Sequence, residues 1–181
     1  MSYLFGVQQK VLEKDLYMKL HKAWGSHLPV LIKLVEITDG NILELGSGIF
    51  STPYLHWACL PTKRQLTSYD HSPQYSDYLK QYEDPEFHEV IHVDDYDDAM
   101  IEKHWDIAFF DHAPEARRKV DIARLANLAK YLVIHDSDPK TDGHYRYSEI
   151  YPLFKYRYDY TAVSPNTTIL SNFVDLTDFH I

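Results

Sequence analysis

The sequence predicts an α/β protein with a doubly wound sheet of seven strands, mostly parallel. Three observations predict this class: short apolar runs alternate with helical segments, these runs lack the polar alternation of half-exposed strands, and the chain finishes with two β-rich runs joined by a turn. Apolar strands are expected where helices cover both faces of a parallel sheet. Repeated strand–helix units of this kind build doubly wound folds.

The N-terminal segment is expected to be helical. Three leucines recur four residues apart: Leu12, Leu16 and Leu20. The apolar residues of the segment 28–35 follow the same helical period and predict a second helix. Ser26 is expected to cap this second helix. His27 lies in the loop before it and is expected near the rim of the sheet, where that helix packs beside the first strand.

The remaining elements follow in a regular order. Five strands are expected at residues 41–45, 65–69, 90–93, 105–110 and 131–135. Helices are expected between them at residues 49–59, 73–82, 98–102 and 115–130. Two last strands are expected at residues 156–163 and 167–174. The turn between these two is too short for a parallel crossover, so they should form an antiparallel hairpin. We expect one domain, with added helices over residues 1–39 and the core over residues 40–181.

The composition favours a small-molecule partner. The chain of 181 residues has a formal net charge of -9, which repels a nucleic-acid backbone at long range. Its single cysteine, Cys59, excludes an intramolecular disulfide and a cysteine-based zinc cluster. No apolar run approaches the length that spans a bilayer. We therefore expect neither a nucleic-acid nor a membrane partner, and a cytoplasmic location; the oligomeric state is not predicted.

A glycine-rich loop joins the first expected strand to its helix. The segment 43–48 reads LELGSG, in which Gly46 permits a tight turn and Gly48 lets the backbone approach a ligand closely. Ser51 or Thr52 can donate a hydrogen bond near the start of the helix. A glycine loop that follows a strand and opens a helix predicts a ligand site more strongly than the same letters elsewhere.

Two details distinguish this loop from a dinucleotide-binding fingerprint. Ser51 stands where the third glycine would be, and Glu44 places an acid inside the strand. A pyrophosphate gains nothing from a carboxylate there, whereas a ligand with a cationic amino-acid end gains a charge-assisted hydrogen bond, directly or through water. A dinucleotide oxidoreductase is therefore disfavoured.

The pattern LELGSG in this setting resembles motif I of the class I S-adenosylmethionine-dependent methyltransferases. The resemblance covers roughly residues 41–174 and includes the terminal antiparallel hairpin. It implies a Rossmann-like sheet and S-adenosylmethionine as cofactor. The residues of the loop and its flanks expected to bind the cofactor are Glu44, Gly46, Ser47, Gly48, Ser51 and Thr52.

Two further acids are expected along the cofactor crevice. Asp70 ends the second strand about twenty residues after the loop, where an acid meets ribose hydroxyls in this fold class. Its alternative role is a helix cap, which Ser72 can also supply. His71 follows directly and is assigned to the same site. In the family an acid after the third strand can bind the adenine amino group, and the resemblance implies this role for Asp94. Alternatively, Asp94 belongs to a solvated acidic loop at a helix N-terminus.

The candidate chemistry lies at the ends of strands four and five. Asp111 follows strand four, and Asp136 follows the strand that ends at His135. Adjacent parallel strands bring their carboxyl ends together, so the two aspartates should face a common space. Two carboxylates there can hold a divalent cation, or one can act as a general base.

The surrounding segments, FFDHAPEARR and LAKYLVIHDSD, resemble the corresponding stretches of catechol O-methyltransferase and related magnesium-dependent O-methyltransferases. The resemblance implies that Asp111 and Asp136 bind a divalent cation such as magnesium and that His112 contacts adenine. Ser137 replaces the family's metal-binding asparagine, and Pro114 stands where its catalytic lysine is expected.

These departures leave the identity of the base open. Without the lysine, the base would be His135, Asp136 or His112, and we assign catalysis to Asp111, Asp136 and His135. The predicted function is methyl transfer from S-adenosylmethionine to an oxygen of a small molecule or sugar. The alternative is a non-catalytic binding or assembly protein that keeps the fold. N-methylation is less expected, because strand four ends in DHAP rather than in the motif of amino-group enzymes.

Overall fold

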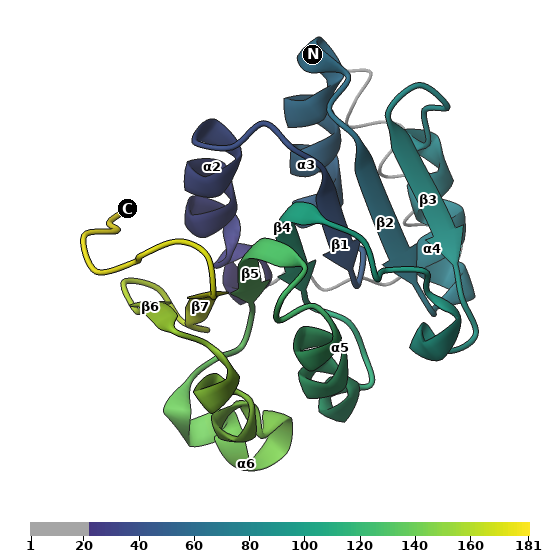
Figure 1. The fold of residues 1–181 in the computed structure, drawn as a ribbon. Helices are drawn as coiled ribbons and strands as arrows, with labels where there is room; N and C mark the ends of the chain where they lie inside the picture. The colour runs from purple at the N-terminus through teal and green to yellow at the C-terminus, as the bar shows by residue number, and fades with distance from the viewer. Residues whose placement is uncertain (1–21) are drawn as a thin grey trace.

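The centre of the fold is one seven-stranded sheet (Figure 1). The computed structural model describes residues 22–181, so the helix expected around Leu12, Leu16 and Leu20 lies outside the described residues. The strands are β1 (Ile42–Leu45), β2 (Leu66–Asp70), β3 (His88–His92), β4 (Trp105–Phe110), β5 (Ala129–Ile134), β6 (Tyr156–Tyr160) and β7 (Thr167–Ser171). Their order across the sheet is β3-β2-β1-β4-β5-β7-β6.

The direction of the strands confirms the predicted architecture. β3, β2, β1, β4 and β5 pair in parallel, whereas β7 runs antiparallel to both β5 and β6. The strand order reverses beside β1, because β2 lies on one side of it and β4 on the other. Open α/β sheets bind ligands at the carboxyl ends of the strands beside such a switch point.

Helices cover both faces of the sheet. They are α2 (Leu28–Glu36), α3 (Ser51–Cys59), α4 (Pro73–Leu79), α5 (Arg118–Arg124) and the short α6 (Asp142–Tyr145). Figure 1 shows α2 and α3 on one side of the sheet and α5 on the other. The core is divided accordingly: one apolar cluster includes Leu31 and Leu55 from α2 and α3, and the other includes Ile122 from α5. Among the described residues, no helix combines the length and apolar character that crossing a bilayer requires.

Several boundaries differ from the prediction because strand pairing overrides local pattern. The helix expected over residues 115–130 is a 3₁₀ turn, Glu115–Arg117, followed by the short α5, because Ala129 pairs with Trp105 and joins β5. The strand expected from residue 90 already begins at His88, which pairs with Leu66.

Two smaller predictions were wrong. The helix expected over residues 98–102 is a single 3₁₀ turn at Tyr96–Asp98, in which the Asp95 carboxylate accepts a hydrogen bond from the backbone of Asp97. The N-cap of α2 is His27 rather than Ser26, and it makes no side-chain cap. The hydroxyl of Ser26 instead reaches across to the end of β5.

Candidate active site

A cavity of about 570 Å³ opens at the carboxyl ends of β1, β2, β4 and β5. This volume lies within the range of small-molecule and cofactor sites. The predicted site residues that line it are Gly46, Ser47, Gly48, Ser51, Asp70, His71, Asp111, His112, His135 and Asp136. The structure therefore brings these residues together around one space. Glu44, Thr52 and Asp94 are not among the lining residues.

The turn after β1 contains two glycines, and its backbone requires glycine at only one of these positions. Gly46 has a φ of 87°, which L side chains rarely adopt, and a Cβ there would lie 2.3 Å from the backbone nitrogen of His112. At Gly48 the nearest atom to an added Cβ would be Ser51 Oγ, at 3.4 Å. The fold therefore needs Gly46 for its own backbone, whereas Gly48 leaves space at the cavity wall.

Glu44 and Thr52 support this loop through a chain of hydrogen bonds. The carboxylate of Glu44 is fully buried and accepts hydrogen bonds from Thr52 Oγ1 at 2.8 Å and Ser68 Oγ at 2.6 Å. Thr52 Oγ1 in turn accepts from the backbone nitrogen of Gly48 at 3.0 Å. Burial raises the pKa of Glu44 to about 7. Both residues thus hold the loop in place through side-chain hydrogen bonds and lie outside the cavity wall.

Asp70 ties the end of β2 to the glycine loop. Its Oδ2 accepts from the backbone nitrogen of Ser47 at 2.9 Å, and its Oδ1 accepts from that of Ser72 at 2.7 Å. The side chain is nearly buried yet lines the cavity, and burial raises its pKa. Asp94 differs, because its side chain is fully exposed and its carboxylate lies 3.4 Å from His92 Nε2.

His112 is fixed in the cavity wall by a buried carboxylate. Its Nε2 lies 3.0 Å from Asp121 Oδ2, and its ring packs on Tyr96 with the ring centres 4.3 Å apart. Arg117 and Arg124 also pair with Asp121, so the carboxylate that orients the ring is itself fully satisfied. This arrangement holds the imidazole fully buried behind the cavity wall.

Arg118 joins the two aspartates that the sequence predicts as metal ligands. Its Nη2 lies 3.0 Å from Asp111 Oδ1 and its Nη1 lies 3.1 Å from Asp136 Oδ2. The guanidinium is buried, and its Nε donates to the backbone oxygen of His112 at 2.6 Å. Tyr145 also donates to Asp136 Oδ2, at 3.0 Å. The structure thus favours a guanidinium, rather than a metal ion, between Asp111 and Asp136.

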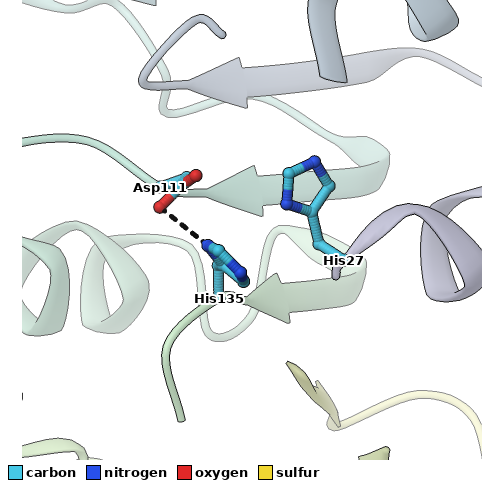
Figure 2. Close-up of side chains that lie close together, drawn as sticks. All are labelled: His27, Asp111 and His135. Atoms are coloured by element: carbon cyan, nitrogen blue, oxygen red, sulfur yellow. Dashed lines mark ion pairs between the residues drawn. The ribbon is translucent and has the colours of Figure 1, made fainter. Parts of the chain in front are cut away.

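A second cluster is formed by Asp111, His135 and His27 (Figure 2). His135 Nδ1 forms an ion pair with Asp111 Oδ1 at 3.1 Å, and the ring of His27 lies beside that of His135 with centres 4.8 Å apart. Burial and the neighbouring His135 lower the pKa of His27 to about 3. Burial acts in the same direction on His135, but Asp111 outweighs it and raises the pKa of that imidazole.

The charge on Asp111 is maintained by its two neighbours. Burial alone would raise the pKa of this carboxyl, but His135 and Arg118 together hold it below its ordinary value.

Asp136 takes up a left-handed backbone conformation with a φ of 57°. That conformation follows the end of β5 directly, where the chain turns away from the sheet toward α6.

The fold matches known proteins although the sequence does not. No family model and no curated protein matches the chain. The O-methyltransferase from Bacillus cereus, solved with S-adenosylhomocysteine, is 17% identical with a TM-score of 0.67, over 94% of this chain and 90% of that one. TomG, an O-methyltransferase of tomaymycin synthesis from Streptomyces achromogenes solved with S-adenosylmethionine, is 18% identical with a TM-score of 0.65, over 94% and 89%.

The chain has the fold of these O-methyltransferases. The predicted Rossmann-like sheet and its reversed last strand are therefore confirmed, as is the resemblance at the level of fold. Sequence reasoning missed Arg118. The available signal was its position at the start of the helix after strand four, where its side chain can reach both strand ends.

Proposed function

We propose that the chain is an S-adenosylmethionine-dependent methyltransferase that methylates an oxygen atom of a small molecule. One observation carries this proposal: in a fold shared with O-methyltransferases, the glycine loop after β1 and the carboxylate of Asp70 line the same cavity. Ten of the residues that the sequence assigns to the site line this cavity.

The residues present fit the cofactor. Gly48 lines the cavity and leaves open space where a side chain would stand, which allows the backbone of the loop to approach a ligand. Asp70 is an acceptor at the end of β2, where the ribose is held in this fold class. His112 lines the same wall with its ring fully buried, and His71 lies beside Asp70. Glu44 and Thr52 act on the cofactor only through the loop that they support.

The bound cofactor would supply an electrophilic methyl group on a sulfonium. The protein's part is to align an acceptor hydroxyl and to receive its proton. Asp111 is the best-placed group for this, because its carboxylate lines the cavity and is kept ionised by Arg118 and His135. His135 and Asp136 are positioning residues in this account: His135 orients Asp111, and Asp136 holds the far side of Arg118.

The acceptor is proposed to be small and not a nucleic acid. The wall of the cavity carries four carboxylates and one guanidinium, and the chain has a net charge of -9. A phosphate backbone would be repelled by such a surface. The segment before α2 lines the cavity through Ala23, Trp24 and His27 and would contact the acceptor.

The test is release of S-adenosylhomocysteine across a panel of hydroxylated acceptors. We expect turnover with at least one acceptor, and we expect Asp111→Asn to lower kcat by about 10²-fold or more, the range for loss of a general base. Affinity for S-adenosylhomocysteine should stay within a few-fold of the wild type. The matched control is Asp94→Asn, which removes an exposed acid outside the cavity and should change neither quantity.

Two outcomes would contradict this assignment. Turnover that survives in Asp111→Asn would exclude Asp111 as the proton acceptor. Cofactor binding without turnover on any acceptor would favour a binding or assembly protein with the same fold.

A further inference from the structure

We propose that His27, Asp111 and His135 form a binding site for a divalent transition-metal ion of the zinc class. The three side chains come from the residue before α2, the end of β4 and the end of β5, and Figure 2 shows them converging. One potential ligand atom from each lies within 4.8 Å of the other two. The site requires no methyl donor, so it goes beyond the proposed function and can stand without it.

His27 is buried at the cavity without polar partners among residues 22–181. The side chain is buried, with 2% of the residue exposed, and it lines the cavity. Within the part of the chain that the structure describes, neither of its ring nitrogens has a hydrogen-bond partner. Burying polar atoms without partners is costly, and such atoms in native proteins are usually satisfied by water, an ion or a ligand. His27 is thus a buried donor group that lacks its acceptor or its metal.

The hydrogen bonds of Ser26 fix the tautomer of His135. The hydroxyl of Ser26 donates its only proton to the backbone oxygen of Pro165, at 2.8 Å. The 2.9 Å contact between Ser26 Oγ and His135 Nε2 must therefore be donated by the imidazole. In the neutral ring this leaves the lone pair on Nδ1, the atom that faces Asp111. Hydrogen bonds from the remote nitrogen orient metal-binding histidines in the same way.

The short distance between His135 and Asp111 requires a cation. A neutral Nδ1 and a carboxylate oxygen are both acceptors, yet they lie 3.1 Å apart. Only a cation can hold them together, either a proton on Nδ1 or a metal ion between the two groups. His135 and Arg118 both approach Oδ1 of Asp111, so Oδ2 can bind an ion while Arg118 stays in place.

The geometry suits a small ion with few protein ligands. Ligand bonds of about 2.0–2.2 Å in a tetrahedron place ligand atoms roughly 3.3–3.5 Å apart. The ligand atoms of the three residues lie within 4.8 Å of one another, so small side-chain movements bring them to that value. Three protein ligands leave one position open, and all three residues line the cavity. An ion here would therefore face any molecule bound in the cavity.

The ligand types select the metal. Two imidazoles and one carboxylate suit zinc, iron, cobalt or nickel, whereas magnesium takes oxygen ligands. The site therefore differs from the magnesium site implied by the sequence resemblance, in which Asp136 would be a ligand. Asp136 Oδ2 is instead occupied by Arg118 and Tyr145. A net negative charge from Asp111, Asp136 and Arg118 remains beside the ion and favours its binding.

The experiment is calorimetric titration of the full chain, freed of metal by a chelator and carrying no histidine tag, with Zn²⁺ and separately with Mg²⁺. We expect one Zn²⁺ ion per chain, bound at least 100-fold more tightly than Mg²⁺. His27→Ala should lower the Zn²⁺ affinity by 100-fold or more, and Ser26→Ala by about 10–100-fold through loss of the orienting hydrogen bond. His144→Ala removes an exposed histidine outside the cluster and should change nothing.

A spectroscopic measurement keeps the test independent of folding defects. Co²⁺ bound to the wild type should give visible absorption bands of a low-coordinate site, and His27→Ala should lose them while its thermal unfolding remains cooperative. Equal Zn²⁺ affinity in the wild type and His27→Ala would overturn the proposal. So would the absence of Zn²⁺ binding, which would mean that a proton alone joins His135 and Asp111. Either result would overturn the metal site alone, because the proposed binding of S-adenosylhomocysteine does not depend on it.

Discussion

Replacing Arg118 with leucine is expected to lower the free energy of unfolding by roughly 3 kcal/mol, the lower end of the range for removing one partner of a buried ion pair. The guanidinium pairs with Asp111 and Asp136 and donates to the backbone of His112. The two carboxylates are partly exposed, so water can compensate some of the loss. Urea denaturation monitored by fluorescence measures the change.

The neighbouring residue provides the matched control. Lys119 forms a single ion pair with Glu149, and that carboxylate is exposed. Lys119→Leu should therefore cost less than about 1 kcal/mol. Adding Asp111→Asn and Asp136→Asn to Arg118→Leu should recover part of the lost stability, because no unpaired carboxylate then remains. Equal effects of the Arg118 and Lys119 substitutions would show that the guanidinium does not organise the two strand ends.

Replacing Gly46 with alanine is expected to lower the free energy of unfolding by at least about 2 kcal/mol. The left-handed backbone conformation contributes strain of about 1–3 kcal/mol, and the new Cβ would meet the backbone of His112 at 2.3 Å. Backbone atoms at the end of β4 cannot rotate away as a side chain can. Thermal or urea unfolding of the purified variant measures the loss, and failure to fold would be the extreme form of it.

Gly48→Ala is the matched variant in the same loop. Its Cβ would meet only Ser51 Oγ, at an ordinary contact distance of 3.4 Å, and the stability should change by less than about 0.5 kcal/mol. If Gly46→Ala were as stable as Gly48→Ala, the conformation of the turn described above would be incorrect.

The fold was predictable because it depends on pattern. Apolar strands such as β4, alternating with helices, determine a parallel sheet, and the short turn before β7 admits only an antiparallel hairpin. Gly46 was predictable for a similar reason, since a sharp turn at a strand end needs a residue that tolerates positive φ. These features depend on local chemistry and on topology, both of which the sequence displays.

The parts of the site that were not predicted depend on side-chain reach. Arg118 lies on a helix, and its path back to Asp111 and Asp136 depends on where that helix begins, which strand pairing decides. Glu44 was expected to meet the ligand, yet alternate residues of a buried strand face opposite sides, and its side chain joins the Thr52 and Ser68 hydroxyls instead. The pattern of residue types does not fix such directions.

The proposed cofactor site is tested most directly by calorimetric titration of the wild-type chain and of the Gly48→Val variant with S-adenosylhomocysteine. We expect one bound molecule per wild-type chain and an affinity at least ten-fold lower in Gly48→Val, whose larger side chain would enter the cavity, with thermal stability unchanged. Absence of binding to the wild type, or equal affinity in the two proteins, would contradict the proposed site.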